Sequence, residues 1–333
     1  GAAPLQNRAV TPPATTPARR RWRAWLLRLS LTGIALTWAL RQTSWNALQQ
    51  HWRLLPAGVW LLAALTYASG LGLGALRWQL LLRAYGAQTV PRWPWLWRAY
   101  WVAFFYNTFL PANVGGDVLR GYVTRRAWPS TGAAFWVVLI ERLLGLAGLV
   151  TLASLALPSA GLGLGLWPGV GALVALGGVA CGLWLPALLQ RHAVRLPGRL
   201  PVLVRHIPPL TSPGALAWAA LLSISTHLVV ALSGHWLLSA LHPALPLGAA
   251  LTFIPIATAT AYLPTIAGLG TREAALLALL GRVGVPAAIT LSGALALFGV
   301  QAGVAALGGL LHLSQPLTPA GSPKGDRAPG VHA

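Results

Sequence analysis

The chain has 333 residues, of which 56% are hydrophobic and 8% charged, and 24 lysines and arginines against 4 acidic residues give it a formal net charge of +20. An ordinary globular domain carries about 25% charged residues, and a soluble nucleic-acid-binding protein keeps a mixed-charge surface around its core. The composition and the long apolar runs therefore exclude most soluble classes and predict an all-α integral membrane protein. A single cysteine, Cys181, excludes a disulfide framework and a cysteine-based metal site.

The chain divides into three regions. Residues 1–21 are rich in Pro, Thr and Arg and are expected to form a disordered, basic cytoplasmic arm. Residues 22–313 are expected to form a single transmembrane domain, and residues 314–333 a disordered tail. Six apolar stretches approach or exceed the length that a bilayer demands. They are Trp22–Leu40, Pro56–Leu76, Thr131–Leu157, Trp167–Leu189, Gly214–Leu241 and Pro286–Leu313.

Two further apolar stretches, Arg98–Arg120 and Leu247–Arg282, are interrupted by Pro and Gly in their middles. Arginines gather in the arm and in alternate loops, and the positive-inside rule then places both termini in the cytoplasm. The first cytoplasmic loop in this scheme carries Arg77, Arg83, Arg92 and Arg98. This topology has about six full spans, provided that each interrupted stretch is a re-entrant pair of half-helices that returns to the side of the membrane from which it enters.

The two interrupted stretches share a pattern. Phe109–Gly115 and Tyr262–Gly268 both read aromatic, Leu, Pro, three residues, Gly. Proline breaks a helix and glycine permits a turn, and irregular backbone at membrane depth is tolerated where it lines a cavity. The predicted helix-break residues are Pro111, Gly115, Gly116, Pro264, Gly268 and Gly270. Two such breaks, one from each side, indicate an inverted repeat around a central site, as in transporters.

Three of the four carboxylates lie in or beside the apolar regions, namely Asp117, Glu141 and Glu273, whereas Asp326 lies in the tail. Carboxylates at membrane depth are costly, and they are usually paired and functional. Asp117 has Arg120 three residues on, a spacing that brings helical side chains together. Glu141 and Glu273 are each adjacent to an arginine, Arg142 and Arg272 respectively. Adjacent helical residues point about 100° apart, so these two pairs are expected to bond across helices and not to each other.

Such ion pairs admit two interpretations, a structural staple that fixes helix register or a site for a substrate headgroup. Arginine suits a phosphate because its planar fork binds two oxygens, and the N-termini of half-helices add N–H donors. His227 and His235 lie eight residues apart in one span, and for them we expect packing or helix-to-helix hydrogen bonds. The sequence predicts no metal site and no cofactor.

Three motifs in order carry a resemblance: Phe105–Arg120, then Glu141-Arg142-Leu143, then Gly268–Glu273. Together they resemble the lysylphosphatidylglycerol synthase transmembrane, or flippase-like, family over about residues 22–313. The resemblance implies a polytopic protein of the bacterial inner membrane that moves a phospholipid or a polyprenyl-linked lipid between leaflets. The soluble aminoacyl-transferase domain of the multiple peptide resistance factor is not present in this sequence, which removes lysyl transfer from the expected activities.

The functional prediction is thus a flippase-type transporter of a phospholipid, such as an aminoacylated phosphatidylglycerol, or of a polyprenyl-linked lipid. The predicted substrate-binding residues are Asn107, Asn113, Asp117, Arg120, Glu141, Arg142, Arg272 and Glu273. No catalytic residue is assigned and no nucleic-acid partner is expected. Two alternatives stay open, a membrane-embedded lipid transferase and a non-transporting partner of a lipid-modifying synthase, and a homodimer or a cytoplasmic synthase are the protein partners considered.

Overall fold

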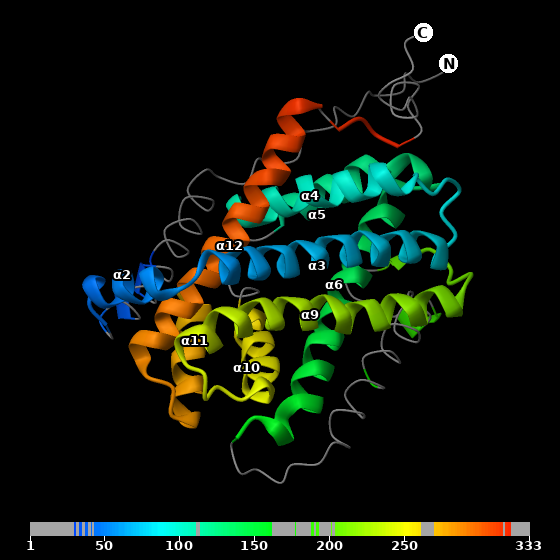
Figure 1. Cartoon of the computed structure of the whole chain (residues 1–333). Helices are drawn as coiled ribbons and strands as arrows, with labels where there is room; N and C mark the ends of the chain where they lie inside the picture. Colours follow the sequence, from blue (N-terminus) through cyan, green and yellow to red (C-terminus); the bar gives the residue numbers. More distant parts are fainter. Residues whose placement is uncertain are drawn as a thin grey trace, which may run out of the picture.

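A computed structural model describes residues 43–110, 114–161, 204–260, 270–315 and 317–320, together with isolated positions outside these ranges. Within these residues the protein is entirely helical, as the sequence predicts (Figure 1). The α-helices are α2 (Trp45–Leu54), α3 (Ala57–Ala84), α4 (Trp93–Phe109), α5 (Gly115–Thr124), α6 (Thr131–Ala156), α9 (Pro213–Leu241), α10 (Leu247–Ala259), α11 (Thr271–Leu280) and α12 (Ala287–Ser314). Short 3₁₀ turns follow α5, α6 and α11 at Arg125–Ala127, Leu157–Ser159 and Gly281–Val283.

Four helical segments of the described chain are long and apolar enough to cross a membrane: Ala57–Ala84, Thr131–Ser159, Pro213–Leu241 and Ala287–Ser314. Each matches one of the predicted spans. The second and third begin after a serine whose hydroxyl accepts a hydrogen bond from the third residue beyond it, Ser130 from Ala133 and Ser212 from Ala215. The predicted spans Trp22–Leu40 and Trp167–Leu189 lie almost wholly outside the described residues.

Both interrupted stretches are two helices, as predicted. The first is α4 followed by α5, and the second is α10 followed by α11. In each stretch the two helices contact each other, so the chain folds back at the break. The break residues Pro111, Pro264 and Gly268, and the candidate Asn113, lie outside the described residues.

The expected end of the span Pro56–Leu76 was wrong. The helix α3 continues past Leu76 to Ala84, because the sequence after Arg77 remains apolar and helix-forming. Arg77 therefore lies within the helix and is buried, with 8% of its surface exposed. This helix runs beside α9 over most of its length (Figure 1).

Small residues allow the helices to approach closely, as is common in membrane bundles. A Cβ atom added to Gly148 of α6 would lie 2.8 Å from the Cβ of Ser223 in α9, and one added to Gly116 of α5 would overlap the carbonyl oxygen of Ala103 in α4. After α12, the segment 317–320 returns to the bundle, where the Ala320 N–H donates to the Val123 carbonyl at 2.9 Å. This segment therefore ties the end of α12 to α5.

Candidate functional site

The first half of the site begins at the N-terminus of α5. Gly116 packs so closely against α4 that no side chain fits there. Its N–H donates to the Asn107 side-chain oxygen at 2.7 Å, so a side chain of α4 satisfies one of the unpaired amides at the start of α5. The next residue, Asp117, is the third of the helix. A carboxylate there is favoured by the positive end of the helix dipole.

The second half of the site repeats this arrangement at the N-terminus of α11. Gly270 precedes the helix with a φ of +84°, a conformation that favours glycine. Its N–H donates to the Glu273 carboxylate at 2.6 Å, and Glu273 is the third residue of α11. In both halves, therefore, a glycine at the break is followed by an acid in the third position of a short helix.

Glu141 of α6 is the centre of the first half. One carboxylate oxygen accepts a hydrogen bond from Arg77 of α3 at 2.8 Å, and the other accepts one from Arg120 of α5 at 2.5 Å. Only 1% of the Glu141 surface and 4% of that of Arg120 are exposed. A buried carboxylate needs such partners, because its desolvation is otherwise uncompensated. Glu141 thus joins three helices at one point.

Asp117 extends this network toward the surface. It accepts a hydrogen bond from Arg120 at 2.7 Å and one from Arg142 of α6 at 2.6 Å. The predicted pairing of Asp117 with Arg120 is confirmed. The expectation that Glu141 and Arg142 bond across helices is confirmed as well, since their partners lie on α3 and α5.

The same expectation holds only in part for Arg272 and Glu273, because Arg272 bonds across helices but the two residues also contact each other. The Glu273 carboxylate turns back to cap its own helix, which brings it within reach of Arg272 at 3.3 Å. Arg272 also donates to Gln301 of α12 at 2.9 Å, and its guanidinium lies 5.8 Å from the ring centre of Phe298. The capping contact therefore decides the pairing in this half.

Aromatic rings surround the first half. The guanidinium carbon of Arg120 lies 5.5 Å from the ring centre of Trp78 and 5.1 Å from that of Tyr100. The Tyr100 hydroxyl accepts from Arg77 and donates to Glu141, both at 3.3 Å. Rings in these positions stabilise a cation in a dry environment.

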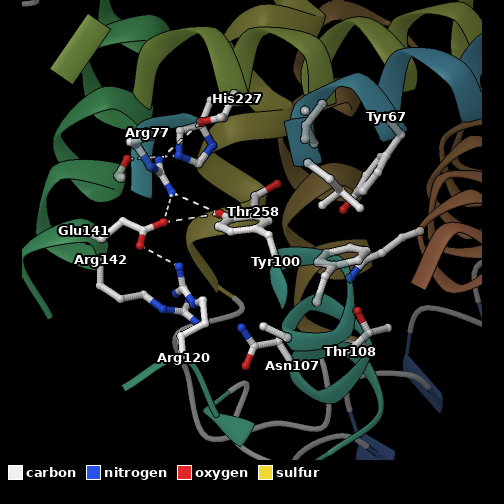
Figure 2. Close-up of a pocket in the computed structure, with 18 of the residues that line it drawn as sticks. Tyr67, Arg77, Tyr100, Asn107, Thr108, Arg120, Glu141, Arg142, His227 and Thr258 are labelled. Carbon is white, nitrogen blue, oxygen red and sulfur yellow. Dashed lines mark hydrogen bonds and ion pairs between the residues drawn. The ribbon is translucent and has the colours of Figure 1, made fainter. Parts of the chain in front are cut away.

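A cavity of about 230 Å³ connects the two halves (Figure 2). Arg77, Glu141 and Arg120 meet at one side of it, and Tyr67 lies across from them. Thr108 also lines the cavity, and its buried hydroxyl has no hydrogen-bond partner among the described residues. The polar lining residues are Tyr67, Arg77, Tyr100, Asn107, Thr108, Arg120, Glu141, Arg142, Thr226, His227, Thr258, Arg272 and Gln301. They come from eight helices of both halves.

The structure brings most predicted site residues together. Asn107, Arg120, Glu141, Arg142 and Arg272 line the one cavity. Asp117 and Glu273 each bind an arginine of that lining. Gly115, Gly116 and Gly270 lie at the starts of the two short helices.

Sequence reasoning missed Arg77, Tyr100 and Gln301. The apolar sequence that continues on both sides of Arg77 is the signal that could have placed this residue inside a helix instead of in a loop. Tyr100 and Gln301 carry no comparable signal. His227 forms the expected helix-to-helix hydrogen bond, at 2.9 Å to the Gly145 carbonyl of α6.

Comparison with protein families identifies a match over most of the chain. The family described as the lysylphosphatidylglycerol synthase TM region matches residues 25–309, which is most of the chain. A search of curated proteins finds no match. The family match covers every helix described above except the last residues of α12, and it includes both halves of the site.

Proposed function

Because the chain belongs to the lysylphosphatidylglycerol synthase TM region family, we propose that this multi-pass membrane protein is a flippase-type lipid transporter. It moves a phospholipid or a polyprenyl-linked lipid between the leaflets of a bacterial inner membrane. The headgroup phosphate occupies the cavity between α5 and α11, and the acyl chains stay in the bilayer.

The composition of the cavity carries this proposal. Four arginines line it, Arg77, Arg120, Arg142 and Arg272, against the single carboxylate of Glu141. Asp117 and Glu273 bring the carboxylates that contact these arginines to three, so the group retains one positive charge. A guanidinium binds phosphate oxygens through paired N–H groups. An anionic headgroup is therefore the ligand that this charge balance favours.

The size of the cavity supports a headgroup as its occupant. Pockets for drug-sized ligands usually measure about 300–1,000 Å³, and this cavity measures about 230 Å³. A phosphate with a small substituent fits such a volume, whereas two acyl chains do not. Because membrane-spanning helices surround the cavity, the acyl chains of the lipid stay outside the bundle, in the hydrocarbon of the bilayer.

The matching starts of α5 and α11 support an inverted repeat, and for this repeat we propose six spans with both termini cytoplasmic. In transporters of this type the interrupted helices of the two halves meet at a site near the midplane. Here Asp117 and Glu273 hold the same position in the two short helices, and the arginines that they bind line one cavity. A rocking movement of one repeat against the other would expose that cavity to each side of the membrane in turn.

Leaflet exchange in proteoliposomes tests the proposal. The purified protein is reconstituted with labelled phosphatidylglycerol, aminoacylated phosphatidylglycerol, phosphatidylethanolamine or a polyprenyl phosphate, and the label exposed in the outer leaflet is followed. We expect exchange of an anionic lipid that Arg120→Gln and Glu141→Gln abolish. The control is Arg126→Gln, at an exposed arginine beyond α5. If every lipid stays in its leaflet with the wild-type protein, the transport proposal fails.

A further inference from the structure

The seam between α5 and α6 presents two exposed apolar stripes. The exposed side chains of Val114, the residue before α5, and of Val118 and Tyr122 on α5 follow one another at intervals of four residues. On α6 Phe135, Leu139 and Leu143 do the same. Residues four apart lie on one helix face, and an exposed apolar face in a multi-pass membrane protein contacts hydrocarbon.

A polar contact crosses the seam between these stripes. Asp117 of α5 and Arg142 of α6 form an ion pair at 2.6 Å, and each is the sequence neighbour of a stripe residue. Their side chains are 14% and 24% exposed, against 5% and 1% for Arg120 and Glu141 behind them. The ion-pair network is thus most accessible at this seam.

The position of the pair along α5 connects it to the basic end of the bundle. Arg125 follows Asp117 by eight residues, which corresponds to about 12 Å along a helix axis. Arg125 is held by its donation to the Tyr122 carbonyl at 2.6 Å and by stacking on the Tyr122 ring at 3.6 Å. A cationic side chain thus lies on the chain of α5 about two turns of helix from the ion pair whose arginine, Arg142, lines the cavity.

We infer that the seam between α5 and α6 is the lateral portal through which the substrate lipid reaches the cavity, with the Asp117–Arg142 pair as its latch. This inference rests on the proposed transport function. The lipid phosphate replaces Asp117 as the partner of Arg142 while the acyl chains lie along the two stripes. The ligand is a lipid and not free phosphate, because only a lipid uses the apolar stripes and the arginine together.

The latch fits this role because it is the accessible member of the network. The second half offers no equivalent among the described residues, since the side chains of Arg272 and Glu273 are 8% and 0% exposed. A neighbouring carboxylate also keeps Arg142 paired when no lipid is present, which limits the cost of a partly buried charge.

Photo-crosslinking tests the portal directly. Benzoylphenylalanine is placed at Val118 or Leu139 of the full chain in vesicles that contain radiolabelled phosphatidylglycerol or phosphatidylcholine. Control positions are Leu65 of α3 and Leu221 of α9, whose side chains are also exposed. At the two seam positions we expect about fivefold more labelling by phosphatidylglycerol than by phosphatidylcholine, which is the preference that one arginine near an anionic lipid supplies. At the control positions we expect the two lipids to label equally.

The protein with benzoylphenylalanine at Val118 also tests which residue causes the preference for phosphatidylglycerol. A further Arg142→Gln substitution should remove this preference, whereas Arg126→Gln should leave it unchanged. Excess glycerol phosphate should not compete, because it lacks acyl chains. Equal labelling at all four positions, or competition by glycerol phosphate, would overturn the portal.

A reversible disulfide tests whether the seam must open. A Cβ atom at Gly121 of α5 would lie 2.6 Å from the Phe135 ring of α6, so these positions are in direct contact. Gly121→Cys/Phe135→Cys, in a Cys181→Ser background, should lose leaflet exchange when oxidised and recover it when reduced. The control pair is Ala63→Cys/Ser233→Cys, where the Ser233 hydroxyl donates to the Ala63 carbonyl between α3 and α9.

The outcomes separate the two proposals. If the oxidised seam pair exchanges lipid as fast as the reduced pair, the portal is wrong and the transport function stands. Loss of exchange with both cysteine pairs would also overturn the assignment to this seam. If the wild-type protein exchanges no lipid, the transport function fails, and selective labelling at Val118 and Leu139 would still identify the seam as a lipid site.

Discussion

Arg77 and Glu141 meet at 2.8 Å across α3 and α6, although 64 residues separate them in the sequence. Glu141 also binds Arg120, so one buried carboxylate compensates two buried guanidinium groups. Removing one partner of a buried pair leaves an uncompensated charge, which costs about 3–5 kcal/mol. The fold and the proposed site therefore depend on the same carboxylate.

We predict that Glu141→Ala lowers the free energy of unfolding by about 3–5 kcal/mol. Arg77→Ala/Glu141→Ala should cost less than the sum of the two single substitutions, because it removes a charge of each sign. Unfolding in mixed micelles, followed by circular dichroism, measures all three variants. Arg126→Ala is the exposed control. Strict additivity of the two substitutions would contradict a coupled pair.

Gly116→Ala tests the close contact between α4 and α5. The added Cβ would overlap the Ala103 carbonyl, so α5 must move away from α4. Overpacking of this kind costs about 1–3 kcal/mol, and the movement should also weaken the hydrogen bond from the Gly116 N–H to Asn107. Gly72→Ala is the control, since a Cβ there meets nothing within 4 Å. Equal stability of the two variants in the same unfolding measurement would argue against this packing.

The two helix breaks could be predicted from the sequence because their causes are local. Proline and glycine weaken a helix locally, and a proline followed four residues later by glycine marks each break. An acid in the first turn of a helix is stabilised by neighbouring backbone. The pairing of Asp117 with Arg120 is local too, since three residues separate them. Position in the sequence alone was enough for these features.

Arg77 was misplaced because the positive-inside rule counts arginines near the expected end of a span. The structure extends α3 past that end and gives Arg77 a partner on α6. Only the packing of α3 against α6 and α9 brings the two residues together. The pairing of Arg272 with Glu273 was misjudged for a different reason. The Glu273 carboxylate accepts a hydrogen bond from the Gly270 N–H, and this cap turns it in a direction that helix geometry alone does not predict.

Tyr100→Phe tests the hydroxyl that joins Arg77 and Glu141. The substitution removes two hydrogen bonds to charged groups and keeps the ring beside Arg120. Each hydrogen bond to a charged group contributes about 1.5–3 kcal/mol, and both bonds here are long at 3.3 Å. We therefore expect the two together to cost at least the lower end of that range, with slower lipid exchange.

Gly74→Ala should have a similar effect by another route, because a Cβ there would lie 2.5 Å from the Tyr100 ring. The ring must move, and its hydroxyl then leaves Arg77 and Glu141. Exchange and unfolding are measured for both variants. If Gly74→Ala impairs exchange and Tyr100→Phe does not, the ring position and not the hydroxyl is what matters.

Gly270→Ala tests the start of α11. At a φ of +84° and a ψ of −50° a side chain is strained, and a residue in such a sparsely populated backbone conformation costs about 1–3 kcal/mol. Relief of this strain would turn the Gly270 N–H away from Glu273 and would shift Arg272, which contacts both Glu273 and Gln301. We therefore expect lower stability and slower lipid exchange. Gly281→Ala at the other end of α11 is the matched control, since its φ is −58° and a Cβ there meets nothing within 4 Å. A Gly270→Ala protein that unfolds and exchanges lipid like Gly281→Ala would show that the cap does not hold Arg272 at the cavity.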